Sequence, residues 1–265
     1  MTNIHLTGED GYTLYALYDA KMREIIKDDL NMNQIDQIWY RPSFGRGSGI
    51  KIKEKGEIKS LGYSGFGEPD ALIIGKDSNE NTIIAFVEAK LENIENSNNI
   101  RQLRYQFLLK LCLINSILSG SIRKEFNKNN TYYTVDLQTD SSNVGILNNK
   151  LNEYYKEYKH NSKNDRNNGW ILKDGSVNAP ALKELADILN KQSSFIIKFY
   201  AVGFKKSQTL GDSAQEIKQT ELLPESVCKH IDTKLLNSCE NGKFHFTSRH
   251  LPINKIVSIQ IQSNK

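Results

Sequence analysis

The chain is 265 residues long, with 38% hydrophobic and 25% charged residues, a composition typical of a folded protein and not of a disordered one. Its formal net charge of +4 is compatible with a nucleic-acid partner but does not identify one. The sequence contains neither a signal peptide nor a run of about 18 apolar residues, so we expect a soluble cytoplasmic protein without a membrane partner. Three cysteines do not form an even disulfide framework, which predicts reduced thiols.

The first segment with a helical pattern extends from Thr7 to about Asp29. Thr7 and Asp10 resemble a capping box, and apolar residues such as Leu14 and Met22 then recur at helical spacing. We therefore expect one N-terminal helix.

Two strand-like segments follow this helix. Residues 35–41 are predicted to form a strand, and residues 50–59 alternate apolar with charged side chains, as a half-exposed strand pair does. The lysines of the second segment could line a nucleic-acid groove or protect an exposed sheet edge from aggregation, and both interpretations stay open. These lysines are Lys51, Lys53, Lys55 and Lys59.

The most informative stretch is Gly67 to Lys90. Its apolar runs at residues 71–74 and 83–87 are separated by a polar segment, which predicts a hairpin of two buried strands. Because alternate residues of a strand share a face, Glu88 and Lys90 should point the same way. Asp70 can join them only if the numbers of paired residues add to an even total, so that Asp70 lies opposite Glu88 or Phe86. We predict this even register.

Residues 100–119 have the clearest helical pattern in the chain. The predicted buried stripe consists of Ile100, Leu103, Phe107, Leu111, Ile114 and Leu118. The opposite side is expected to carry Arg101, Gln102, Arg104, Gln106 and Lys110.

The second half of the chain has weaker signals. We expect a strand at residues 131–135, helices at 144–158 and 179–191, and a strong strand at 195–204 that extends the central sheet. This assignment makes residues 139–193 a mainly helical insertion. A final helix at 225–238 and a strand at 253–261 complete the prediction. The C-terminal cysteines and histidines have spacings that fit no close-paired zinc motif.

The residues Pro69-Asp70, followed by Glu88-Ala89-Lys90 at the end of the next predicted strand and then by a helix, resemble the signature of the PD-(D/E)XK nuclease superfamily. The resemblance covers about residues 10–125. It implies a restriction-endonuclease-like α/β fold in which helices flank a central mixed sheet on both faces. The apolar character of both hairpin strands independently predicts helices on both faces. We interpret residues 1–265 as a single nuclease domain.

The resemblance also implies roles for individual residues. Asp70, Glu88 and the carbonyl of Ala89 would bind Mg²⁺, for which Mn²⁺ can substitute. Lys90 would orient or deprotonate the attacking water, or stabilise the pentavalent transition state. The helix after the lysine strand often contributes a glutamine, which gives Gln102 as a fourth catalytic candidate. Many members carry a further acid on the first helix, and we assign neither Glu9 nor Glu24 to the site.

The function expected from these residues is Mg²⁺-dependent hydrolysis of phosphodiester bonds in DNA, by an endonuclease of a restriction or antiviral defence system. RNA is not excluded, because the motif contacts phosphates and not sugars. Two other classes remain: an effector nuclease gated by a ligand or partner that binds the insertion, and a silent nucleic-acid-binding subunit with the nuclease fold. By analogy with enzymes that cut both strands, we expect a homo-oligomer, most simply a dimer.

Overall fold

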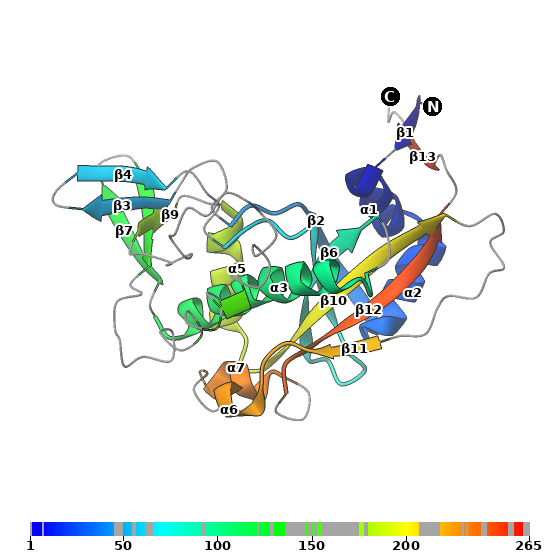
Figure 1. Ribbon diagram of the computed structural model, residues 1–265. Coiled ribbons are helices and arrows are strands. Elements are labelled where there is room, and N and C mark those ends of the chain that lie inside the picture. The colour runs from blue at the N-terminus through cyan, green and yellow to red at the C-terminus, as the bar shows by residue number, and fades with distance from the viewer. Residues whose placement is uncertain are drawn as a thin grey trace.

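The computed structural model describes residues 2–6, 8–44, 50–54, 57–61, 66–91, 94–120, 122–127, 130–135, 147, 150, 153–154, 175–177, 180–206, 218–228, 231, 233–239, 243–253 and 257–261. Its helices are α1 (Gly8–Tyr18), α2 (Ala20–Asp29), α3 (Ser97–Leu118), α5 (Pro180–Lys191), α6 (Glu225–Cys228) and α7 (Thr233–Asn237). Figure 1 shows how they are arranged around the sheets.

The strands fall into three sheets. The central sheet has six strands in the order β11-β12-β10-β6-β5-β2: β11 (Lys218–Glu221), β12 (His245–Ile253), β10 (Phe195–Lys206), β6 (Thr82–Lys90), β5 (Ala71–Lys76) and β2 (Gln34–Tyr40). A five-stranded sheet has the order β4-β3-β9-β8-β7: β4 (Glu57–Leu61), β3 (Ile50–Glu54), β9 (Gly175–Val177), β8 (Asn130–Val135) and β7 (Ile122–Asn127). β1 (Thr2–Leu6) pairs with β13 (Val257–Ile261), which brings the two ends of the chain together.

The central sheet is mixed and open. β10 runs parallel to both β6 and β12, whereas β2, β5 and β11 each pair antiparallel with their neighbour. The predicted extension of the sheet by residues 195–204 is therefore confirmed: β10 lies directly beside β6. The chain is an α/β protein in which a parallel pair is formed only after a long crossover.

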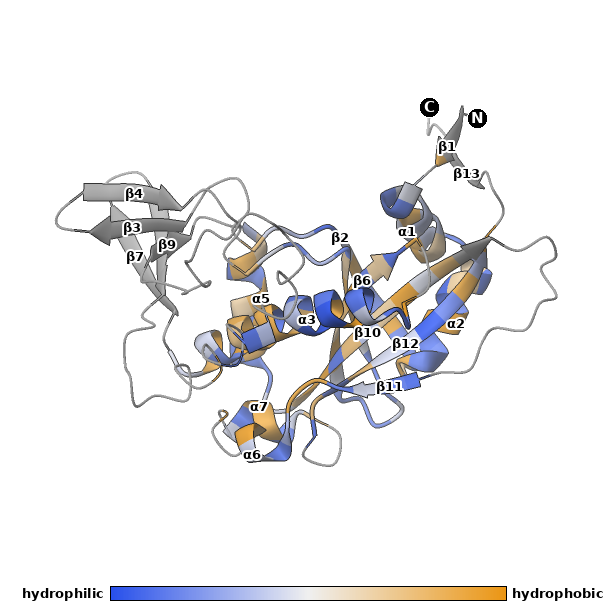
Figure 2. Cartoon of the chain, viewed as in Figure 1, coloured by the Kyte–Doolittle hydropathy of each residue, from blue (hydrophilic) through white to orange (hydrophobic). Residues whose placement is uncertain are grey.

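Helices cover both faces of this sheet, as predicted. On one face, α3 packs against side chains that include Leu72, Phe86 and Phe199. On the other face, α1 and α2 pack against Ile73 and Val202, among others. The residues of β5 and β6 are buried on both faces, which accounts for their nearly continuous apolar sequences. Figure 2 shows hydrophobic residues along these central strands and hydrophilic ones at the start of α3.

The hairpin register agrees with the prediction. Ala71 pairs with Val87 and Lys76 with Thr82, so the paired numbers add to an even total. A loop of residues 77–81 joins the strands, and the Asp77 carboxylate accepts hydrogen bonds from the backbone N–H groups of Asn79 and Asn81. This local turn chemistry fixes the loop length and hence the register.

The predicted N-terminal helix is in fact two helices. Asp19 is extended and caps α2, because its side chain accepts hydrogen bonds from the backbone N–H groups of Lys21 and Met22. Apolar periodicity alone does not show such a break, whereas an aspartate at an N-cap does.

The C-terminal third also differs from expectation. The predicted helix at 225–238 is divided into the short helices α6 and α7. The strand predicted at 253–261 is present as β13, whereas β12, which ends at Ile253, was not predicted. The strand pair predicted at 50–59 is confirmed as β3 and β4, but β7 was not predicted.

Most of the predicted insertion, 139–193, lies outside the described residues. Within it the structure describes β9, α5 and four helical positions: Leu147, Lys150, Glu153 and Tyr154. α3 is long at 22 residues, yet neither it nor another helix of the described part carries an apolar stretch sufficient to span a membrane.

Candidate active site

Asp70 lies at the point where the chain enters the central sheet. It immediately precedes β5, and because Ala71 pairs with Val87, Asp70 is level with Glu88 on the neighbouring strand. Its Oδ2 accepts a hydrogen bond of 2.6 Å from the backbone N–H of Ala89. Burial raises the pKa of the Asp70 carboxyl, and the Ala89 N–H and the positive charge of Lys90 partly oppose this rise.

Glu88 and Lys90 lie on the face of β6 that α3 covers. The side chain of Glu88 is only 1% exposed, and its Oε1 has no hydrogen-bond partner. Burial, together with the negative charge of Asp70, raises the pKa of Glu88 to about 8, although Lys110 and Lys90 oppose the shift. Lys90 is also buried, and its Nζ donates a 2.8 Å hydrogen bond to the carbonyl of Ala89.

Glu9, at the beginning of α1, contacts Lys90 and Leu91 at the end of β6, although α1 packs on the opposite face of the sheet from α3. Its Oε1 is 3.8 Å from Nζ of Lys90, and its Oε2 accepts a 3.2 Å hydrogen bond from the backbone N–H of Leu91. Burial is the main cause that raises the pKa of Glu9, and Lys90 lowers it. The structure thus places at the site an acid that the sequence interpretation left out.

A helical signal in the sequence distinguishes Glu9 from Glu24. Glu9 precedes the buried residues Tyr12 and Thr13 by three and four positions, so it shares their side of α1. Glu24 instead forms a 2.5 Å ion pair with Lys27 on α2, and its side chain is 57% exposed.

Lys110 is the residue that the sequence interpretation placed wrongly. It was expected on the exposed side of the helix, yet its side chain is only 1% exposed. Its Nζ is 3.7 Å from Oε1 of Glu88 and donates a 2.9 Å hydrogen bond to the carbonyl of Phe66. The signal was present, because position 110 follows Phe107 by three residues and precedes Ile114 by four. Burial lowers the pKa of Lys110, and Glu88 opposes the shift.

A second set of charges lies at the rim of the site. Arg41 forms a 2.5 Å ion pair with Asp10 on α1 and contacts Glu68 at 3.7 Å. The backbone N–H of Arg41 donates to the carbonyl of Asp70. Glu68 therefore contacts an arginine beside the site.

His250 borders the site from β12. Lys90 pairs with Gly203 on β10, and Gly203 pairs with His250. A Cβ on Gly203 would lie 2.5 Å from Cδ2 of His250, so the imidazole occupies the space over this glycine. Nε2 of His250 accepts a hydrogen bond of 3.4 Å from the backbone N–H of Ile94. The glycine in a strand is the sequence signal for this close approach.

Among the described residues, no hydrogen bond or ion pair joins Gln102 to this group of residues. It lies eight positions before Lys110 on α3, which corresponds to about 12 Å along a helix axis. In the described part of the chain, Gln102 has no hydrogen bond to Asp70, Glu88 or Lys90. On the same side of α3, Gln106 is nearer to Lys110, and its Oε1 is buried without a hydrogen-bond partner.

The donor atoms at the site suit a hard cation. In the described ranges, no group of three or more His, Cys, Asp or Glu side chains is arranged to hold a metal ion. Mg²⁺, however, is commonly bound by only one or two carboxylates together with waters. The buried Oε1 of Glu88 has no partner and the Asp70 carboxylate is level with it, so Asp70, Glu88 and the Ala89 carbonyl form a fitting set of oxygen ligands.

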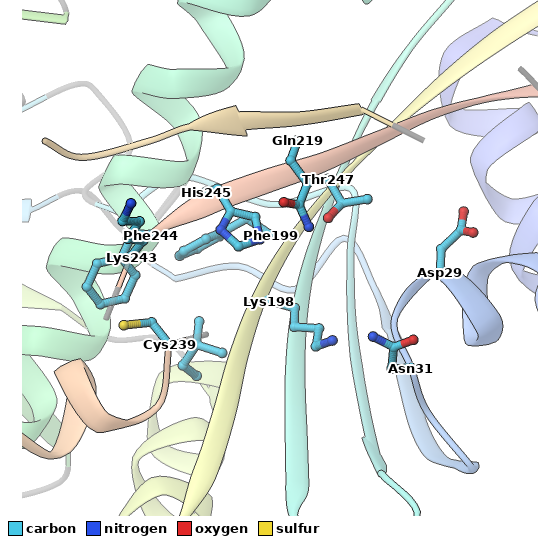
Figure 3. A pocket seen from close by; sticks show the side chains of 11 residues that line it. Asp29, Asn31, Lys198, Phe199, Gln219, Cys239, Lys243, Phe244, His245 and Thr247 are labelled. Atoms are coloured by element: carbon cyan, nitrogen blue, oxygen red, sulfur yellow. The ribbon is translucent and has the colours of Figure 1, made fainter. Parts of the chain in front are cut away.

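A small pocket lies elsewhere on the central sheet. It is lined by residues from the first half of β10, from β11 and β12 and from the end of α2, and its cavity volume is ≈ 50 Å³. Figure 3 shows Lys198, His245 and Gln219 at this pocket. Lys198 is level with Ala85, five residues before Lys90 on β6. This pocket is therefore separate from Asp70 and Glu88.

No protein-family model matches the chain, and no curated protein or solved structure is significantly similar to it.

Proposed function

We propose that the chain is a Mg²⁺-dependent deoxyribonuclease with a restriction-endonuclease-like fold. The observation that carries the proposal is the meeting of Asp70, Glu88 and Lys90 at one end of the β5–β6 hairpin, with a buried oxygen of Glu88 left without a hydrogen-bond partner. A buried carboxylate with a raised pKa and an oxygen that lacks a hydrogen bond is a candidate for a functional site.

The order of elements supports this proposal. An N-terminal helix with an acid precedes an antiparallel hairpin, and the hairpin is followed by a long helix and a strand parallel to its second strand. Two adjacent strands followed by a helix are the order that the PD-(D/E)XK resemblance implies. Glu9 adds a third carboxylate beside Lys90, at the place where many superfamily members carry an acid on the first helix.

Each side chain has a definite role in this proposal. Asp70 and Glu88, with the carbonyl of Ala89, would hold Mg²⁺. The bound ion would supply charge neutralisation for the phosphodiester and a more acidic water. Lys90, held as an ammonium group between the Ala89 carbonyl and Glu9, would orient the attacking water or stabilise the charge of the pentavalent transition state. Glu9 would keep the ammonium group of Lys90 in position.

The substrate and the biological setting are parts of the proposal with less structural support. A DNA endonuclease of a restriction or antiviral defence system, active as a homodimer, is the form we favour. RNA cleavage, gating by a ligand or partner, and nucleic-acid binding without cleavage are the other outcomes of the test.

The test is cleavage of supercoiled and linear DNA, and of RNA, with Mg²⁺, Mn²⁺ or EDTA. Wild type is expected to nick or linearise DNA only with metal, and Asp70→Asn and Lys90→Met should each reduce the rate by roughly a hundredfold to ten-thousandfold. Asp77→Asn and Lys76→Met are matched controls, because they make the same changes at the opposite end of the hairpin. These controls should cleave at the wild-type rate.

Cleavage that persists in both site variants would contradict the assignment of the site. Tight DNA binding by wild type without cleavage under any metal would favour the binding subunit. Cleavage that appears only after a cell extract or a nucleotide is added would favour the gated effector.

A further inference from the structure

Lys110 on α3 contacts Glu88 and the backbone of the segment that leads into Asp70. Its Nζ is 2.9 Å from the carbonyl of Phe66 and 3.7 Å from Oε1 of Glu88. Phe66 is fully buried and lies four residues before Asp70, while Glu88 is on the adjacent strand. One ammonium group therefore contacts both the segment that leads into Asp70 and the side chain of Glu88.

The backbone at Gly67 is shaped around this lysine. Gly67 has a φ of +73°, and a Cβ at this position would lie 2.9 Å from Nζ of Lys110. Glycine is therefore favoured here both by the backbone conformation and by the space that the ammonium group occupies. Pro69, which is buried, then restricts the path of the chain into Asp70.

Lys110 is too deeply enclosed to touch a nucleic acid. Its side chain is 1% exposed, so a direct contact with substrate would need the core to open. The separation of 3.7 Å from Glu88 is longer than a hydrogen bond, so the lysine limits where the carboxylate lies but leaves its Oε1 available.

We infer that Lys110 is a positioning residue, which sets the mutual geometry of Asp70 and Glu88 for a divalent cation. This inference rests on the proposed function, because it assigns Lys110 a task at the same metal site. It goes beyond that function, since it identifies a residue outside the signature motif on which cation affinity depends. Replacing a residue that supports a metal ligand commonly changes the affinity for the metal.

The experiment is calorimetric titration of the full chain with Mn²⁺ alone, without DNA. Lys110→Met should weaken Mn²⁺ binding by about 10- to 100-fold, and single-turnover cleavage by this variant should recover at high Mn²⁺. Cleavage by Lys90→Met should not recover. The matched control is Lys234→Met, because Lys234 also donates to backbone carbonyls, those of Leu189 and Gln192, far from the site.

A second pair of variants keeps the test decisive if Lys110→Met does not fold. Gly67→Ala places a methyl group against Nζ of Lys110, whereas Gly120→Ala imposes the same backbone strain at a φ of +71° with no atom within 4 Å. Only Gly67→Ala should weaken Mn²⁺ binding.

The outcomes separate this inference from the proposed function. Folded Lys110→Met and Gly67→Ala proteins that bind Mn²⁺ as wild type does would overturn the positioning role and leave the nuclease proposal standing. Wild type that does not bind Mn²⁺ would overturn both proposals. A lower melting temperature with unchanged Mn²⁺ affinity would show that Lys110 serves stability alone.

Discussion

Two groups of buried charges lie on opposite faces of the same sheet, and their hydrogen bonding differs. On the α2 face, Asp29 accepts a 2.7 Å hydrogen bond from Arg249 and a 2.6 Å hydrogen bond from the hydroxyl of Tyr200, and Nε of Arg249 is 2.5 Å from its Oδ2. On the α3 face, Glu88 has Lys110 at 3.7 Å and an oxygen without a hydrogen-bond partner. We name these groups the Asp29 cluster and the Glu88 pair.

The difference separates a structural group of charges from a candidate functional one. Both Asp29 oxygens have close partners, which fix the end of α2 on β10 and β12. The Glu88 pair leaves hydrogen-bonding capacity unused in a buried place, which is costly for stability. Such a cost is expected where a site is prepared for a ligand.

The largest effect on stability is expected in the Asp29 cluster. Arg249→Met would leave the Asp29 carboxylate, whose side chain is 2% exposed, without its charged partner. The free energy of unfolding should fall by about 3–5 kcal/mol, measured by urea denaturation. Lys218→Met is the control, because the Lys218–Glu95 ion pair is exposed and should contribute about 1 kcal/mol or less. If both substitutions lowered the free energy of unfolding equally, burial would not account for a difference between the two ion pairs.

A smaller effect is expected from the third member of the Asp29 cluster. Tyr200→Phe removes a hydrogen bond to an ionised carboxylate and leaves the packing of the ring unchanged. The free energy of unfolding should fall by about 1.5–3 kcal/mol, without a change in Mn²⁺ affinity. A change in Mn²⁺ affinity would contradict the separation of the two groups of charges.

The pH dependence of the metal-free protein sharpens the comparison further. The pKa of Glu88 is raised from 4.5 to about 8, so the folded state favours the protonated carboxyl. The protonated Glu88 carboxyl therefore stabilises the folded state relative to the ionised one. This stabilisation is fully present below pH 4.5 and is lost as the pH rises through about 8. The charged groups that act on Glu88 are Lys110 on α3, Asp70 before β5, Lys90 on β6 and Glu9 on α1.

Glu88→Gln mimics the protonated carboxyl and does not titrate. Its free energy of unfolding should therefore rise relative to wild type as the pH is raised from 5 to 8, by at most about 1.4 kcal/mol per pH unit. Urea denaturation across this pH range measures the difference. Parallel curves for the two proteins would show that the pKa of Glu88 is not raised.

Local patterns in the sequence predicted much of the fold that surrounds the candidate site. The apolar runs of β5 and β6 specified two buried strands, and the need for Asp70 to join Glu88 specified the even register that the structure has. The stripe on α3 identified buried residues such as Leu103 and Phe107, but from Phe107 to Ile117 this helix is buried on all sides, which the stripe did not predict. Each of these predictions depends on neighbours that are close in sequence.

The parts that were missed depend on contacts between distant segments. Glu9 reaches Lys90 across more than 80 positions of the sequence, and His250 approaches the site because Gly203 leaves space between two parallel strands. The helical pattern places Lys110 beside buried residues, but the carboxylate that lies within its reach is on another segment of the chain. Only the tertiary arrangement supplies such partners.

The measurement that tests the account most directly is single-turnover cleavage of supercoiled DNA with Mg²⁺ by three proteins side by side: wild type, Glu88→Gln and Tyr200→Phe. We predict that Glu88→Gln loses cleavage without a lower melting temperature, and that Tyr200→Phe loses stability but cleaves at the wild-type rate. Cleavage by Glu88→Gln at the wild-type rate would contradict the account.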